Sequence, residues 1–491
     1  MVEKLRNCFD EMVVYKNQKA NLFSELTLPS FMRDWLLKKF QDEDGHFDSD
    51  EMKRFVYAYL PKREDWKGIK NRVIYDYQRV KFLAKVAVDI DIKTGLVTFS
   101  MPDYGLTHSD TIIDAAVWEE CRADLLGGHE TWGMVEIGYK PPDEELGGFG
   151  LFSAKSKKMN NGKIKLITFK KFCPYTVEVS HFKEVRREFE IDEWIDILLG
   201  AVDYNAKGFC NKEEKLTMLT RLLPFVEKRL NLIELAPKGT GKSYLFGRVS
   251  RFGWLSSGGV MSRAKMFYDQ SKRVVGLVAG NDFITLDEVQ TISFTNTDEI
   301  RAALKGYLEF GVFTVGNFQG EADAGVILCG NIRQELMNRD DYINMFIDLP
   351  PVFHESALID RFHGFIKGWN IPRMTEGHMM VGWALNSEYF CSIMHELRSD
   401  TSYRSIVEQL IKCPEDADKR DTEAIKRIAT AYLKLLFPHV KSLKDISRSD
   451  FEEYCFKRAR NMRGTIKYQL GELDAEFSGK DLPALEVIQP L

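Results

Sequence analysis

A glycine-rich loop after a short apolar run, near the middle of the chain, constrains the fold more than any other segment. Residues 231–235 (NLIEL) predict a buried strand, 236–243 (APKGTGKS) predict a tight loop, and 244–250 predict the start of a helix. Backbone N–H groups in such a loop surround phosphate oxygens at the positive end of the helix. The segment therefore predicts an α/β fold built around a nucleotide. The residues expected to contact that nucleotide are Pro237, Lys238, Gly239, Thr240, Gly241, Lys242, Ser243 and Tyr244.

One position departs from the usual phosphate-loop pattern, because Ala236 stands where the pattern has its first glycine. A Cβ is tolerated there if the backbone keeps a negative φ. Lys242 is expected to reach the β- and γ-phosphates, and Ser243 is expected to offer its hydroxyl to Mg²⁺. ATP and Mg²⁺ are therefore the expected cofactors.

Two further strand-like runs end in polar side chains. Residues 283–288 (FITLDE) predict a strand that ends in two carboxylates. Asp287 is expected to hold Mg²⁺ through water, and Glu288 to polarise the attacking water. The run 326–330 (VILCG) leads to Asn331, whose amide is expected to help orient that water. Together with the glycine-rich loop, these runs predict ATP hydrolysis.

An arginine follows these strands, in the sequence Asp360-Arg361-Phe362. A phosphate-loop strand, an acidic strand, an amide-tipped strand and a late arginine, in this order, resemble an AAA+ ATPase module. In such modules the arginine stabilises transition-state charge in a neighbouring subunit's site. The alternative for Arg361 is an ordinary surface ion pair.

The periodicity and composition of the residues change several times along the chain and predict a series of segments. We expect a helical region at 1–70, a β-rich and barrel-like antiparallel domain at 71–183, and the α/β core with its preceding helices at 184–350. The arginine segment and a helical lid follow at 351–475. The tail at 476–491 is expected to be loosely ordered.

A lysine-rich stretch at 152–172 stands out within the β-rich region, because it contains no acidic residue. Asn160-Asn161-Gly162 is a turn signal at its centre, so the stretch predicts a basic hairpin. It could be a strand edge that lysines protect from pairing. The density of like charge favours contact with a phosphate backbone. The lysines expected to contact DNA are Lys155, Lys157, Lys158, Lys163 and Lys165.

Composition narrows the class of protein. The apolar fraction of 44 % and the charged fraction of 29 % are typical of a globular protein in water. No uninterrupted apolar run reaches the roughly 18 residues of a membrane helix, and the N-terminus lacks the apolar block of a signal peptide. Eight scattered cysteines without a C-x-x-C motif indicate reduced thiols and a cytoplasmic location. With a net charge of only −5, a nucleic-acid partner needs a local basic patch.

Several segments together resemble one known family, the BREX-system Lon-like ATPases called BrxL. The segments that carry the resemblance are 231–243, 274–289, 326–332, 357–372 and 420–438. The resemblance covers most of the chain. It implies phage defence, ring-shaped oligomers (a hexamer or a multiple of it), duplex DNA and other BREX subunits as partners, and no membrane.

The ATPase core is also similar to that of the minichromosome-maintenance helicases. Arg361 occupies the place of their arginine finger, and Arg420 that of a second sensor arginine that also acts on the neighbouring subunit. An apolar stripe on the helix around 425–436 leaves Arg420 at the helix start and off the stripe. Arg427 is the alternative for this second role.

Two departures limit this resemblance. Many family members continue into a Ser–Lys protease domain, whereas the present chain has no room for one, so proteolysis in cis is not expected. The hairpin at 311–325 has two acidic residues and no basic residue. In the related helicases, a basic residue at the tip of this hairpin contacts DNA. A solvated helix is the alternative for the basic residues just before the acidic strand. The residues expected to grip DNA instead are Arg263, Lys265, Lys272 and Arg273.

Three functions compete at this point. The leading hypothesis is a DNA-binding or DNA-translocating ATPase ring that acts against phage. The second is a protein-remodelling ATPase, for which an aromatic pore loop would be diagnostic; Phe267, Tyr268 and Phe313 are the possible aromatics, with the core as the alternative for each. The third is a nucleotide-switched scaffold that hydrolyses ATP slowly.

Overall fold

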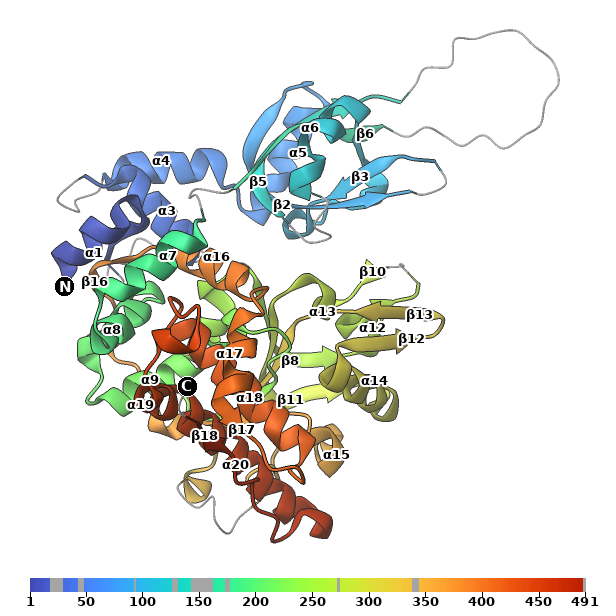
Figure 1. Ribbon diagram of the computed structural model, residues 1–491. Helices are drawn as coiled ribbons and strands as arrows, with labels where there is room; N and C mark the ends of the chain where they lie inside the picture. Colours follow the sequence, from blue (N-terminus) through green and yellow to red (C-terminus); the bar gives the residue numbers. More distant parts are fainter. Residues whose placement is uncertain are drawn as a thin grey trace. The chain divides into compact units, whose positions relative to one another are not determined.

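The computed structural model forms two compact units (Figure 1). One unit combines Met1–Lys39 with Tyr175–Leu491, and the other is Phe40–Pro174.

No helix in the described part of the chain is long and apolar enough to span a bilayer. The structure describes residues 1–17, 30–42, 48–91, 94–125, 131–142, 162–172, 177–271, 274–337 and 344–488.

The larger unit is built on a parallel sheet of five strands. Counted along the chain, their spatial order is fifth, first, fourth, third, second, so the first strand lies inside the sheet between the fifth and the fourth. All five residues of the first strand, β7, are buried, as expected for a strand covered on both faces. This confirms the predicted α/β class. The strands are β7 (Leu232–Ala236), β8 (Gly253–Met261), β11 (Phe283–Phe294), β14 (Gly325–Asn331) and β15 (Gly364–Lys367).

Side-chain alternation along these strands separates two apolar clusters. In β14, Ile327 and Cys329 belong to one cluster, and Val326 and Leu328 belong to the other. The first cluster includes the helices before the sheet and most of the C-terminal helices, of which α17, α18 and α20 pack side by side (Figure 1). The helices that contribute are α8 (Ile191–Ala201), α9 (Lys212–Thr220), α10 (Leu223–Val226), α16 (Ser387–Leu397), α17 (Ser402–Leu410) and α18 (Lys419–Leu436), while α14 (Thr297–Phe310) and α20 (Lys457–Leu473) add to the second cluster.

The two ends of the chain are tied into this unit by short strands. β1 (Val13–Asn17) pairs antiparallel with β16 (Val381–Leu385), although the sequence predicts only helices before residue 70. In the described part of the tail, 476–488, β18 (Glu486–Val487) pairs with β17 (Ile411–Lys412) and the side chain of Val487 is buried, so this part is not loosely ordered as predicted. In both cases the partner strand lies far away in the sequence, which a local pattern cannot reveal.

In its described residues, the smaller unit is a closed five-stranded barrel with three α-helices. Its strand order, β2-β3-β4-β6-β5, and the position of α6 between β4 and β5 are those of the OB-fold. The barrel is not purely antiparallel as predicted, because β4 and β6 run parallel. The elements are α4 (Ser49–Tyr59), α5 (Trp66–Ile74), β2 (Val80–Ile90), β3 (Val97–Ser100), β4 (Thr111–Ile113), α6 (Ala115–Leu125), β5 (Thr131–Lys140) and β6 (Lys163–Lys171).

Helix α5 belongs to this barrel and not to a separate N-terminal region. Ile69 and Val73 of α5 are buried in the barrel core together with Phe82 and Val86 of β2. The unit begins at Phe40, and therefore earlier than the expected boundary at 70.

Candidate active site

The glycine-rich loop leaves β7 and enters the short helix α11 (Lys242–Tyr244), which continues as a π-helical turn. Gly239 and Gly241 have φ of 82° and 81°, a left-handed conformation that favours glycine. A Cβ on Gly241 would also lie 2.6 Å from the hydroxyl oxygen of Tyr204. The buried Lys242 ammonium donates to the carbonyl of Pro237 at 3.3 Å. The loop therefore has the backbone shape that wraps phosphate groups.

Ala236, the departure from the usual pattern, fits at the end of β7. Its φ is not positive, so the condition for a Cβ at this position is met. The methyl group packs against Gly368, where an added Cβ would lie only 2.3 Å from that of Ala236. A glycine on the neighbouring segment thus provides the space that the alanine needs.

A buried arginine, Arg221, supports the phosphate loop through hydrogen bonds. No sequence motif indicates this role. The Arg221 guanidinium donates to the carbonyl of Thr240 at 2.6 Å and to its hydroxyl at 3.2 Å. The same guanidinium pairs with Glu234 of β7, with the closest atoms 2.5 Å apart, and neither side chain is exposed. Arg221 therefore joins the strand to the residue between the two left-handed glycines.

We expect Arg221→Met to destabilise the protein by about 3–5 kcal/mol, because Glu234 would remain buried without a partner. Replacing both Arg221 and Glu234 by Met removes that unpaired charge, so the double variant should be more stable than the single one. Denaturant unfolding followed by circular dichroism measures both. Equal losses in the single and double variants would contradict a buried ion pair at this position.

The hydroxyl of Ser243 and the carboxylate of Asp287 meet at 2.5 Å. The other carboxylate oxygen of Asp287 accepts from the backbone N–H of Glu288 at 2.9 Å. Magnesium prefers oxygen ligands and often binds through one or two carboxylates together with substrate phosphates. Among the described residues, no three His, Cys, Asp or Glu side chains gather as a metal site of their own. The Ser243 hydroxyl and the Asp287 carboxylate offer the oxygen ligands that an ion bound together with a nucleotide uses.

The acidic strand does not end at Glu288 as the sequence predicts. β11 continues to Phe294, and its pairing with β8 is broken between Asp287 and Ile292. Glu288 lies in this bulge at φ 50°, an uncommon conformation for a residue other than glycine, and the Thr291 hydroxyl donates to its carbonyl at 2.9 Å. The bulge thus directs the exposed Glu288 carboxylate away from the pairing of β11 with β8.

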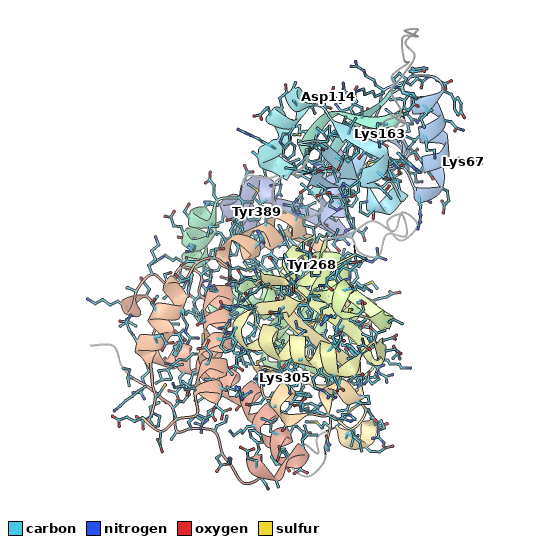
Figure 2. The ribbon with its side chains drawn as sticks, turned by 90° about the vertical axis from the view of Figure 1, so that its right-hand side faces the viewer. Lys67, Asp114, Lys163, Tyr268, Lys305 and Tyr389 are labelled. Atoms are coloured by element: carbon cyan, nitrogen blue, oxygen red, sulfur yellow. The ribbon has the colours of Figure 1, made fainter. Side chains whose placement is uncertain are left out.

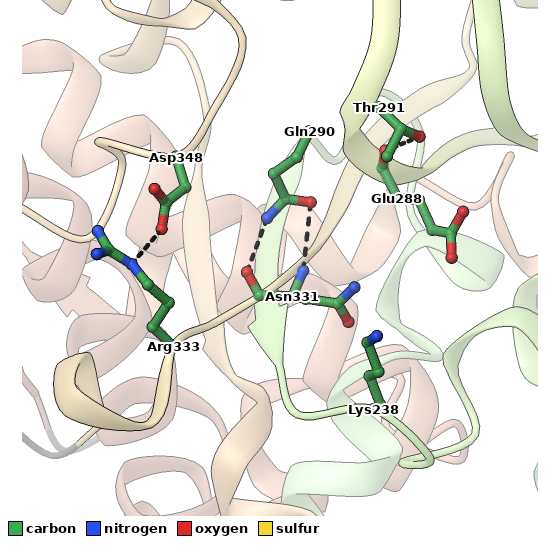
Figure 3. A pocket seen from close by; sticks show the side chains of 7 residues that line it. All are labelled: Lys238, Glu288, Gln290, Thr291, Asn331, Arg333 and Asp348. Atoms are coloured by element: carbon green, nitrogen blue, oxygen red, sulfur yellow. Dashed lines mark hydrogen bonds and ion pairs between the residues drawn. The ribbon is translucent and has the colours of Figure 1, made fainter.

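An open cavity of about 510 Å³ lies beside the loop and receives Glu288 and Asn331 (Figure 3). The Gln290 amide holds the backbone of Asn331 on both sides: its Nε2 donates to the Asn331 carbonyl at 2.7 Å, and its Oε1 accepts from the Asn331 N–H at 3.3 Å. Sequence reasoning missed Gln290, because its partner lies on another strand. The lining residues are Lys238, Glu288, Gln290, Thr291, Asn331, Arg333 and Asp348.

Arg361 and Arg420 do not line this cavity, but the structure brings them together. Both contact the same carboxylate oxygen of Glu309 at the end of α14, each at 3.0 Å. Arg420 also pairs with Asp360 at 2.9 Å. The side chain of Arg361 is 17 % exposed and that of Arg420 is 41 % exposed. Two arginines thus share one surface acid, apart from their own chain's loop.

A third arginine holds this group in place. The buried Arg463 of α20 pairs with Asp360 at 2.5 Å and donates to the Phe362 carbonyl at 2.8 Å. Arg427, the alternative to Arg420, lies elsewhere on α18, where it pairs with Glu423 and donates to the Lys228 carbonyl. Of these two candidates, Arg420 is the one that shares a described partner with Arg361.

The side chain of Tyr244 does not point at the phosphate loop. Its hydroxyl donates to Asp203 at 2.6 Å, within a buried cluster in which Asp203 also pairs with Arg33 and Lys16. Burial and the nearby Asp203 raise the pKa of Tyr244 to about 12, so the phenol remains a donor. Burial alone would raise the pKa of Asp203, but Arg33 and Lys16 hold it below its usual range. The predicted contact of the Tyr244 side chain with the nucleotide is therefore wrong, because its hydroxyl is used within this cluster.

The basic residues expected to contact DNA are placed unevenly. Lys155, Lys157, Lys158, Lys272 and Arg273 lie outside the described residues. On the barrel, Lys163 donates to the Ser109 carbonyl, and Lys165 pairs with Asp114. Lys163 and Asp114 are labelled in Figure 2. Arg263 pairs with Glu299 at 3.2 Å, and Lys265 is exposed.

The aromatic residues considered for a pore loop are mostly in the core. Phe267 and Phe313 are buried, and Tyr268 stacks on Phe318 with ring centroids 3.8 Å apart. Phe267 and Phe313 are therefore core residues, as the alternative for each had it, whereas Tyr268 is half-buried.

Comparison with known proteins gives consistent matches. Residues 164–482 match the model of the "Lon-like protease BrxL-like, ATPase domain" family, and residues 7–139 match "BREX system Lon protease-like protein BrxL N-terminal". The chain is 26 % identical to a protein of Escherichia coli O9:H4 (strain HS) called Lon-like protease BrxL, over 98 % of this chain and 67 % of the relative. A protein of the same name from Bacillus cereus (strain H3081.97) is 27 % identical, over 96 % and 66 %. The chain thus spans about two thirds of the length of these relatives.

Proposed function

Since this chain belongs to the BrxL family of Lon-like proteins, we propose that it is a DNA-binding, ATP-hydrolysing ring protein of bacterial BREX anti-phage defence, acting in the cytoplasm. The observation that carries the ATPase part is the meeting of Lys242, Ser243, Asp287, Glu288 and Asn331 at one edge of the parallel sheet. Bound ATP and Mg²⁺ would supply the scissile phosphate bond and the neutralising charge. Lys242 would bind phosphate oxygens, Ser243 and Asp287 would hold the ion, and Glu288 would accept a proton from water.

The placement of Arg361 and Arg420 supports assembly into a ring. The arginine that does line the cavity, Arg333, is paired with Asp348 at 2.7 Å. Arg361 and Arg420 instead share Glu309 on a different part of the unit, where a neighbouring subunit's phosphate could take over one of them. A head-to-tail ring joins each such surface to the next subunit's cavity.

The barrel supports the DNA part of the proposal. In OB-fold barrels, the connection between the fourth and fifth strands is one of the loops that bind oligonucleotides. In this chain that connection runs from β5 to β6 and includes Lys155, Lys157 and Lys158. The densest run of lysines thus occupies a place in the topology where nucleic acid is commonly bound.

We expect the full chain with Glu288→Gln, saturated with ATP, to bind duplex DNA with an affinity that falls steeply as salt rises. Changing Lys155, Lys157 and Lys158 together to Glu should weaken binding for every sequence. It should also flatten the slope of log affinity against log salt by about 0.9 for each DNA phosphate that the protein no longer neutralises. Fluorescence anisotropy across a salt series measures both quantities.

A charge-matched control changes three exposed lysines of the larger unit, Lys441, Lys444 and Lys480, to Glu. This control should keep the wild-type affinity and slope. If the wild-type chain binds no duplex even at low salt, the DNA part of the proposal is wrong. If both triple variants behave alike, the lysine-rich connection is not the contact.

A further inference from the structure

Two tyrosines on the barrel unit project into solvent from the loop between α5 and β2. Tyr75 is 78 % exposed and Tyr77 is 65 % exposed. The backbone of Tyr77 has φ 53°, which is uncommon for a bulky side chain. The Tyr77 ring lies beside Tyr139 of β5, with centroids 6.0 Å apart and planes tilted by 59°. Tyr139 is half-buried and packs against the barrel core, whereas Tyr75 and Tyr77 are exposed.

Tyr139 is itself held in place by a close contact. Its hydroxyl lies against the Cα of Gly162, where an added Cβ would be only 1.9 Å away. Gly162 directly precedes β6, so this contact lies where the connection between β5 and β6 ends. Any side chain at Gly162 would displace the ring, and the glycine thus keeps Tyr139 beside Tyr77.

Several exposed cations lie close to these tyrosines in the sequence. Five exposed cations flank the loop, whereas Asp76 is the one acid between residues 66 and 81. Glu136 of β5 lies opposite Lys81 of β2 in the strand register. In the described part of the chain, none of the five cations has an ion-pair partner. Lys67 of α5 is labelled in Figure 2. The five cations are Lys67, Lys70, Arg72, Arg79 and Lys81, and the exposed Lys140 ends β5 beside Tyr139.

We propose that this tyrosine patch, defined as Tyr75, Tyr77 and Tyr139 with Arg72, Arg79, Lys81 and Lys140, binds single-stranded DNA. Exposed aromatic rings stack on unpaired bases, and nearby cations follow the strand's phosphates, which is the usual combination in sequence-tolerant single-strand binding. A duplex hides its base faces and would use only the cations.

This inference rests on the DNA-binding function proposed above and specifies which form of DNA the barrel distinguishes. The test measures binding of the full chain to a labelled oligodeoxythymidine, which has no base pairing of its own, and to a duplex. We expect Tyr75→Ala/Tyr77→Ala to lose at least about tenfold in affinity for the single strand, given the contribution of each stacked base. Its duplex affinity should change by less than about twofold.

Two control variants separate stacking from other effects. Tyr57→Ala removes a tyrosine of α4 in the same unit that is 73 % exposed but outside the patch, and it should bind like the wild type. Tyr75→Phe/Tyr77→Phe keeps the rings without their hydroxyls and should retain single-strand affinity. Full affinity in the double alanine variant, or a loss that the phenylalanine variant shares, would overturn the proposal.

The result also distinguishes this inference from the function on which it rests. A wild-type chain that binds neither DNA form would refute the DNA-binding function and the patch together. If the wild-type chain binds duplex but its single-strand affinity is unchanged by Tyr75→Ala/Tyr77→Ala, only the patch is refuted. An equal loss for both forms of DNA would show a general phosphate contact and would likewise overturn stacking.

Discussion

Lys242→Ala is expected to abolish nucleotide binding at ordinary concentrations. The Lys242 ammonium is buried and held over the phosphate loop by the Pro237 carbonyl, so it is already positioned to meet phosphate oxygens. Each hydrogen bond to a charged group contributes about 1.5–3 kcal/mol, and the loss of two lowers affinity by roughly a hundredfold or more. Titration of a fluorescent ADP analogue in the presence of Mg²⁺ measures this change.

Lys238 provides a matched control for this prediction. It lies in the same loop and lines the cavity, but its side chain is exposed. Lys238→Ala should therefore change nucleotide affinity much less than Lys242→Ala. If the two variants lose affinity equally, the loop does not bind phosphate in the manner inferred from its geometry.

Arg361→Ala is expected to lower ATP turnover by about 10³–10⁵-fold, the range seen for arginine fingers, while nucleotide binding and assembly persist. The reason is that Arg361 lies outside its own chain's cavity, on the acid that it shares with Arg420. Arg427→Ala is the control, because Arg427 pairs with Glu423 on the same helix and does not contact Glu309. Phosphate release under saturating ATP measures turnover in both variants.

Mixing two inactive variants tests whether Arg361 acts on a neighbouring subunit. Lys242→Ala subunits retain Arg361 but lack a working loop, and Arg361→Ala subunits retain the loop but lack the arginine. If the arginine acts between subunits, mixed assemblies should recover part of the wild-type turnover. A mixture that stays as inactive as its components would show that Arg361 serves its own chain or none.

Several parts of the site could be predicted from consecutive residues. The loop with Gly239, Gly241 and Lys242 and the carboxylate of Asp287 are recognisable because their chemistry depends on local backbone shape and on short spacings. The α/β class follows from the same runs. The substitution at Ala236 could be judged only conditionally, since the glycine that accommodates it, Gly368, belongs to another segment.

The supporting contacts could not be predicted, because each joins residues that are distant in the chain. Arg221 reaches Thr240, and Gln290 of β11 holds the backbone of Asn331 on β14. A polar residue in a single sequence gives no indication of its partner. The end of the acidic strand was mispredicted for a related reason: the bulge at Glu288 depends on how β11 pairs with β8, and side-chain periodicity does not report a break in pairing.

The sequence by itself determined the phosphate loop, the acidic strand and the family resemblance, since these depend on residues in direct succession. Only the tertiary structure decided that Arg361 and Arg420 share Glu309, that both chain ends pair with internal strands, and that the lysine-rich connection joins two strands of a closed barrel. The physical reason is that strand order and ion-pair partners depend on which buried surfaces pack together. That choice is made by the whole chain and not by any one segment.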